Sequence, residues 1–158
     1  MRPLKRFANR IHTMSTPLTQ KEITEFAVAW YRKLDVHAPM VECLPMLADR
    51  DLEMRFPEVT IRGWAGFEGW FQTVVRLFFD EVHTVKSAKA KISGETATVK
   101  VVVRWEASRW KAPAATSERI VADAYQTWLV RRSAATGKPE IVTYIVDGLK
   151  YARGSAKL

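Results

Sequence analysis

The hydrophobic pattern of this 158-residue chain changes its period once, and that change limits what the chain can fold into. Up to residue 78 the apolar residues recur mainly at helical spacing, whereas from residue 82 onward they alternate with a period of two. Helices followed by strands that tight turns connect predict an α+β domain. The share of hydrophobic residues, 47%, is that of a globular protein and excludes a disordered chain.

Three helices are predicted. The first covers about residues 19–35, carries one apolar stripe and begins at Thr19, which has the spacing of a capping box with the glutamate three residues on. A short second helix over 40–47 is bent or brief because Pro45 removes an interior hydrogen bond. The third helix, over 64–78, has an unusually aromatic stripe.

Five strands are predicted at 52–56, 82–92, 96–107, 119–131 and 140–146. They would form a curved, mixed or mostly antiparallel sheet that wraps around the long first helix, with the two further helices beside it. The concave face of such a sheet lines a conical space, so the sequence predicts a cone with an interior pocket.

The net charge of +8 is concentrated at the two ends of the chain. Residues 1–14 contain four basic residues and no acid, and residues 149–158 contain three basic residues and no acid. The rest of the chain has 18 basic against 17 acidic residues, so the folded part is nearly neutral. A nucleic-acid partner, which requires a basic surface interleaved with aromatic residues, is therefore not expected.

The domain organisation follows from this distribution. Residues 1–14 are predicted to be a disordered basic appendage, which is either a short presequence or the product of a start placed before Met14. Residues 15–150 form a single domain, and residues 151–158 form a flexible basic tail. The lone Cys43 excludes an internal disulfide. With no secretory signal and no long apolar run, a cytoplasmic protein without membrane association is expected.

Several segments together resemble the nuclear transport factor 2-like superfamily, in particular its bacterial-type, SnoaL-like members with a cystatin-like α+β cone. The resemblance covers residues 19–150. It is carried by the segments Trp30–Asp35 at the end of the first helix, Met46–Pro57 leading into the first strand, Gly63 before the aromatic helix, His83–Val85, and Tyr144–Asp147.

The resemblance also sets expectations about chemistry. Ketosteroid isomerase, a member of this superfamily, implies a base Asp immediately before the Pro that ends the first strand, where this chain has Phe56, and a second Asp at the position of Gln126. Isomerase chemistry of that kind is therefore not expected. A site like that of scytalone dehydratase implies a pair of histidines facing the pocket, and His37 and His83 are not predicted to form one.

Four polar residues are candidates from the sequence itself. Counted at period two along the last strand, Asp147 shares a face with apolar residues and is predicted to be a general acid or base, or else a turn cap. His83, the only histidine inside a predicted strand, is the second catalytic candidate. Gln126 is a candidate polar anchor for a ligand or a core amide, and Asp35 is predicted to have a surface or hinge role.

The aromatic residues have two interpretations: they line a pocket for a flat or lipophilic molecule, or they fill the cone themselves. Those predicted to bind the ligand are Trp30, Tyr31, Phe56, Trp70, Trp105 and Trp128.

Two hypotheses about function result. In the first, the domain binds a small hydrophobic molecule in an aromatic pocket, with lyase, isomerase or cyclase activity left open. In the second, it is a non-catalytic module with a self-filled core that forms a homodimer through its sheet. No metal-binding or phosphate-binding motif occurs in the sequence, so no metal or cofactor is expected.

Overall fold

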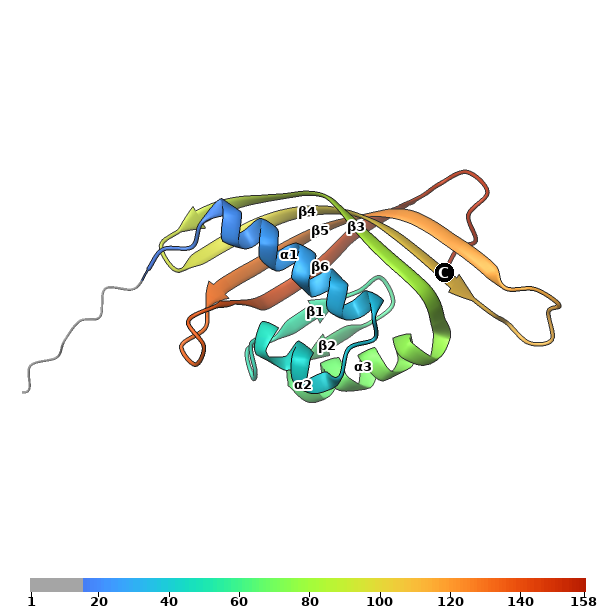
Figure 1. Ribbon diagram of the computed structural model, residues 1–158, viewed down its shortest axis with the longest axis horizontal. Helices are drawn as coiled ribbons and strands as arrows, with labels where there is room; N and C mark the ends of the chain where they lie inside the picture. Colours follow the sequence, from blue (N-terminus) through green and yellow to red (C-terminus); the bar gives the residue numbers. More distant parts are fainter. Residues whose placement is uncertain (1–15) are drawn as a thin grey trace, which may run out of the picture.

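The first helix, α1 (Gln20–Asp35), lies along the concave side of a curved six-stranded sheet in the computed structural model, which describes residues 16–158 (Figure 1). The predictions made for residues 1–14 lie outside the described residues. The α+β cone predicted from the sequence is confirmed, and its sheet is open.

The predicted start of α1 is confirmed by its cap. The Thr19 hydroxyl accepts a hydrogen bond from the Glu22 N–H at 3.1 Å, and the Glu22 carboxylate accepts one from the Thr19 N–H at 3.0 Å. This reciprocal arrangement satisfies two N–H groups that have no partner within the helix. The apolar stripe of α1 is buried against the inner face of the sheet, as its spacing predicts, and consists of Ile23, Phe26, Ala27, Trp30, Tyr31 and Leu34.

A layer of short elements follows. The second helix is brief, as expected: α2 (Met40–Cys43) passes into a turn of 3-10 helix, η1 (Leu44–Met46). Two three-residue strands, β1 (Glu53–Arg55) and β2 (Thr60–Arg62), lead into α3 (Gly63–Leu77), and β2 is an element that the sequence did not predict. In Figure 1, α3 lies on the concave side of the curved sheet.

Four long strands form the rest of the sheet: β3 (Phe78–Ser93), β4 (Thr96–Arg109), β5 (Glu118–Arg132) and β6 (Pro139–Tyr151). The strand order is β2-β1-β6-β5-β4-β3, and the pairing is antiparallel except between β1 and β6, which are parallel. β3 begins directly after α3, four residues earlier than predicted, and β6 extends past the predicted end at 146.

The final residues are bonded to the sheet rather than free of it. The Val121 N–H donates to the Ser155 hydroxyl at 2.8 Å, and the Arg109 guanidinium donates to the Lys157 carbonyl at 2.8 Å. Residue 151, where the predicted basic tail begins, still belongs to β6, and the segment after it has hydrogen-bond partners on β4 and β5.

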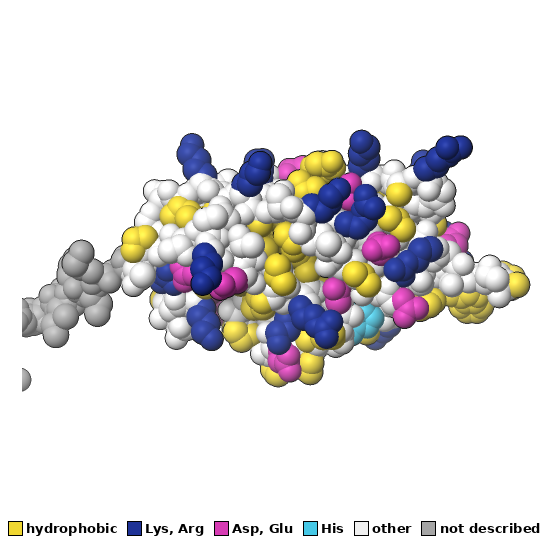
Figure 2. All heavy atoms as spheres, turned by 45° about the horizontal axis from the view of Figure 1, so that its top comes forward, with side chains coloured by type: hydrophobic (Ala, Val, Ile, Leu, Met, Phe, Trp, Pro, Cys, Tyr) yellow, Lys and Arg dark blue, Asp and Glu magenta, His cyan; other side chains and the backbone are white. Residues whose placement is uncertain are grey.

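An ion-pair network crosses three strands on the convex face. Asp123 on β5 accepts hydrogen bonds from Arg104 on β4 at 2.6 Å and from Lys86 on β3 at 3.1 Å. The Arg104 guanidinium, helped by Lys86 and opposed by partial burial, lowers the pKa of the Asp123 carboxyl from 3.8 to about 2. Figure 2 shows cationic side chains interspersed with acidic and hydrophobic ones on this side of the molecule, with no single basic patch.

This network predicts a specific loss of stability in acid. A carboxyl whose pKa is lower in the folded than in the unfolded state stabilises the fold above its unfolded pKa, and that contribution disappears as the pH falls from about 4 to about 2. Asp123→Asn removes the contribution, so its free energy of unfolding should fall below that of the wild type at pH 6 and converge with it near pH 2. Urea unfolding across this range measures the difference. Asn in place of the exposed Asp49 is the control, and an equal loss there would contradict the assignment.

Candidate functional site

A cavity of about 640 Å³ lies between α3, the β1–β2 loop and the concave face of the sheet. Its volume is that of a pocket for a small organic molecule. The cone is therefore not filled by its own side chains, which argues against the self-filled core of the second hypothesis. The lining is mainly apolar, with a few polar side chains from the sheet: Glu81, His83, Arg109, Gln126 and Tyr144.

Aromatic rings form much of the wall. Phe56 stacks on Trp70 of α3, with ring centroids 4.3 Å apart and planes 10° from parallel, and Tyr144 lies 5.8 Å from Phe56. On the opposite side, Trp105 meets Phe78 edge-to-face at 5.3 Å. Such rings offer flat apolar surface to a ligand.

His83 is held on this wall by a single carboxylate. Its Nδ1 lies 2.6 Å from Oδ1 of Asp35, and its backbone N–H donates to Oδ2 of the same residue at 3.1 Å. The imidazole also stacks on Tyr31, with centroids 4.7 Å apart. A neutral imidazole that donates its Nδ1–H to Asp35 has Nε2 as the nitrogen that can accept a proton. The side chains are only 10% and 14% exposed, so the pair is shielded from water.

The structure therefore corrects the role predicted for Asp35. It is the last residue of α1, and its side chain turns toward β3 instead of standing on the surface. A carboxylate at a helix C-terminus faces the negative end of the helix dipole, which is locally unfavourable. The two hydrogen bonds from His83 offset that disadvantage, and they bring together residues 48 positions apart.

Gln126 is a polar residue of the cavity lining, and it is hydrogen-bonded to two aromatic side chains behind it. Its Oε1 accepts hydrogen bonds from the Tyr31 hydroxyl at 2.7 Å and from the Trp128 indole N–H at 2.9 Å. With Oε1 engaged twice, the amide of Gln126 is oriented. Burial raises the pKa of the hydroxyls of Tyr31 and Tyr144, so both remain neutral donors at any physiological pH.

The predicted site residues fall into two groups. Those that line the cavity are Phe56, Trp70, His83, Trp105 and Gln126. Three others, Trp30, Tyr31 and Trp128, are fully buried behind the wall and belong to the core. There they contact the lining residue Tyr144: its ring lies 5.3 Å from that of Trp128 and 6.5 Å from that of Trp30.

Asp147 lies outside the cavity. It is exposed on the convex face and accepts a hydrogen bond from the Thr127 hydroxyl at 2.7 Å. β6 is irregular at two points in its ladder with β5: Val142 is an extra residue opposite Leu129–Val130, and Asp147 is an extra residue opposite Tyr125–Gln126. The bulge at Val142 reverses the alternation, so the even-numbered residues Tyr144 and Val146 face inward. The period-two count from the start of the strand therefore assigned Asp147 to the wrong face.

Sequence reasoning missed Asp35 as a partner of His83, and it missed Glu81, Arg109 and Tyr144 as lining residues. One signal was available, because Asp35 and His83 each belong to a segment that carried the family resemblance. The partner of His83 is a carboxylate from the end of α1 and not a second histidine.

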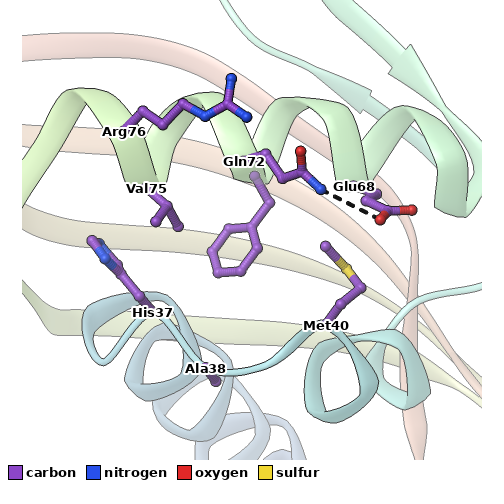
Figure 3. Close-up of a pocket in the computed structure, with 8 residues that line it drawn as sticks. His37, Ala38, Met40, Glu68, Gln72, Val75 and Arg76 are labelled. Atoms are coloured by element: carbon purple, nitrogen blue, oxygen red, sulfur yellow. Dashed lines mark hydrogen bonds between the residues drawn. The ribbon is translucent and has the colours of Figure 1, made fainter.

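A smaller cavity of about 320 Å³ is lined in part by His37. Nε2 of this histidine lies 3.0 Å from Oε1 of Glu81, which lines the main cavity. Figure 3 shows His37 and Met40 below α3 and facing Val75 and Gln72 of that helix, while Gln72 donates to Glu68 at 3.4 Å. This cavity has half the volume of the main one, and Phe71 contributes the one phenyl ring of its lining.

No part of residues 16–158 brings three or more His, Cys, Asp or Glu side chains together as metal ligands. Burial raises the pKa of the Cys43 thiol, which makes it a poor nucleophile. None of the helices described has the length and apolarity needed to cross a membrane.

Comparisons with known proteins agree with the architecture. Hexachlorocyclohexane dehydrochlorinase type 3 from Novosphingobium barchaimii is similar at a TM-score of 0.67 and 14% identity, over 87% of this chain and 92% of that one. A nuclear transport factor 2-like protein from Salmonella enterica has a TM-score of 0.64 and 17% identity, over 87% and 92%. A ketosteroid isomerase-like protein from Erwinia carotovora has a TM-score of 0.63 and 19% sequence identity, over 80% of this chain and 92% of that one.

These likenesses show the fold. The chain has the nuclear transport factor 2-like, cystatin-like α+β fold, as the sequence resemblance implied. No protein-family model matches the sequence, and no curated protein matches it either.

The cavity predicts that filling it blocks binding without unfolding the protein. Ala124 lies on the inner face of β5 and lines the cavity, so the ring of Ala124→Phe would project into open space. We expect 2-naphthol to raise the melting temperature of the wild type and to have no effect on this variant. Val102→Phe adds a ring to the outer face of β4 and should respond like the wild type. Equal responses in all three proteins would contradict the assignment of the cavity as a binding site.

Proposed function

We propose that the protein is an enzyme that removes a proton from carbon in a small, largely apolar molecule and so promotes an elimination or a double-bond shift. The observation that carries the proposal is the Asp35–His83 pair, with its 2.6 Å hydrogen bond, on the wall of an aromatic cavity. A base oriented by a second group and shielded from water is the usual arrangement for general base catalysis.

In the proposed step, Nε2 of His83 takes the proton and Asp35 stabilises the imidazolium that forms. Negative charge then develops on the substrate. The amide N–H of Gln126 and the hydroxyl of Tyr144 are neutral donors in the same cavity and would stabilise that charge. Loss of a leaving group from the neighbouring atom completes an elimination, and reprotonation at another carbon completes an isomerisation.

The fold comparisons give the proposal a context. A protein named as a dehydrochlorinase and one named as ketosteroid isomerase-like share this architecture, and elimination and isomerisation are the two outcomes that the proposed step allows. The base differs from the one that the isomerase resemblance implies, because that position is occupied by Phe56, whose ring is part of the aromatic wall.

The Kemp substrate 5-nitrobenzisoxazole tests the proposal without knowledge of the natural substrate. It is small, flat and aromatic, and removal of its C–H proton breaks the N–O bond to give a coloured phenolate. We expect saturable turnover by the wild type. His83→Gln should lower kcat/KM by about 100-fold or more. Asp35→Asn should lower it by about 10- to 100-fold, because without the carboxylate the imidazole proton is no longer held on Nδ1 of His83.

The same assay tests the sequence-based prediction for Asp147. Because its carboxylate lies on the convex face, Asp147→Asn should retain the turnover of the wild type. Turnover that survives in His83→Gln, with melting temperatures showing intact folds, would overturn the proposal.

We also propose that the protein is a cytoplasmic homodimer that associates through the convex face of the sheet. The supporting observation is a set of apolar side chains on outward positions of β3 and β5 that are 39–44% exposed: Phe79, Val82, Tyr125 and Leu129. Light scattering measures the mass in solution, and Leu129→Lys should convert a dimer to a monomer. A wild-type monomer at high concentration would refute this.

A further inference from the structure

Glu81 is a buried carboxylate on the wall of a mainly apolar cavity. Its side chain is 3% exposed, whereas Glu58, the other glutamate of the lining, lies on the exposed β1–β2 loop. Burying a carboxylate is costly unless it is paired and hydrogen-bonded, and packing alone would be served better by an apolar residue. The arrangement around Glu81 shows how the fold tolerates it.

A bulge in β3 turns Glu81 inward. The register between β3 and β4 shifts between Phe79 and Val82, and Asp80 within the bulge has a φ of 49°. The Arg119 guanidinium on β5, which lies beyond β4 in the sheet, donates to the Asp80 carbonyl at 2.7 Å and so supports the bulge. Bulges of this kind re-aim side chains beside functional sites.

Two groups hold the carboxylate in place, and each uses one oxygen. Oε1 lies 3.0 Å from Nε2 of His37, and Oε2 accepts a hydrogen bond from the Trp105 indole N–H at 3.1 Å. A carboxylate has about four acceptor positions. Capacity for further hydrogen bonds therefore remains on oxygens whose side chain lines the cavity.

We propose that Glu81 is a specificity residue that selects ligands with a hydrogen-bond donor, a hydroxyl or a protonated amine, on an otherwise apolar body. This inference rests on the proposed use of the cavity as a ligand site. A ligand without a donor would leave the carboxylate desolvated and incompletely bonded, and an anionic ligand would be repelled. Sites that contain a buried polar group discriminate strongly against analogues that lack its partner.

The position of Glu81 also limits where the donor lies in the ligand. Glu81 and His83 are two residues apart on the same face of β3, and the rise of a strand separates their backbones by about 6.6 Å. A ligand whose donor is two or three bonds from the carbon that loses its proton can reach both side chains. Glu81 thus orients the substrate for His83 in the proposed reaction.

Matched probes test the proposal by calorimetry: 2-naphthol and 2-(aminomethyl)naphthalene carry a donor, and 2-methylnaphthalene has the same shape without one. We expect the wild type to bind at least one donor probe about tenfold or more tightly than the methyl probe. Glu81→Met should abolish this preference while leaving affinity for the methyl probe unchanged or higher. Glu106→Gln, on the outer face of β4, is the control and should keep it.

The outcomes separate this inference from the proposed reaction. His83→Gln should lose Kemp turnover and keep the donor preference, so failure of the catalytic proposal leaves the binding result intact. If Glu81→Met does not fold, Glu81→Gln keeps the shape and removes the charge, and preference for the amine probe should fall. No donor preference in the wild type, or an unchanged preference in the Glu81 variants, would overturn the inference and leave Glu81 as a support for His37 and Trp105.

Discussion

The hydrogen bonds that the Asp35 carboxylate accepts from the backbone N–H and the imidazole of His83 fix the end of α1 to the sheet. The apolar stripe of α1 holds the helix over the concave face, but apolar packing is not directional and does not by itself fix where the helix ends. The bidentate contact does so, at a point where the last turn of α1 meets the bulged part of β3. The same contact orients the imidazole of His83 on the cavity wall, so the architecture and the proposed chemistry share one interaction.

The overall fold could be predicted from the sequence because its signals are repeated many times. The stripe on α1 contains six buried residues, and the alternation in β4 and β5 extends over whole strands, so one exception does not obscure the period. β2 has only three residues, none of them buried, and a strand that short shows no alternation of apolar and polar residues. The start of β3 was missed for a related reason, because the α3 pattern continues directly into the strand without a turn residue.

The candidate site was only partly predictable, because it depends on departures from the regular pattern. Residues on regular parts of the strands, such as Gln126 and Trp105, lie at the cavity as their alternation indicates. Glu81 and Asp147 lie at bulges, where one added residue reverses the two faces. A bulge is decided by long-range pairing and leaves no local signature in the sequence. The Asp35–His83 contact is also long-range, and the local preference at a helix C-terminus argues against it.

The bulges in β6 have a consequence for how such a cavity can change during evolution. Val142 and Asp147 are extra residues at the two ends of a short stretch in which Tyr144 and Val146 face the interior. Substitutions within this stretch exchange one wall group for another and leave the rest of the sheet in place. Loss or gain of a single residue there would instead exchange the two faces, exposing the tyrosine and burying polar neighbours. The chemistry of the pocket can therefore diversify by point substitution, whereas the length of the strand is held constant by the geometry of the ladder.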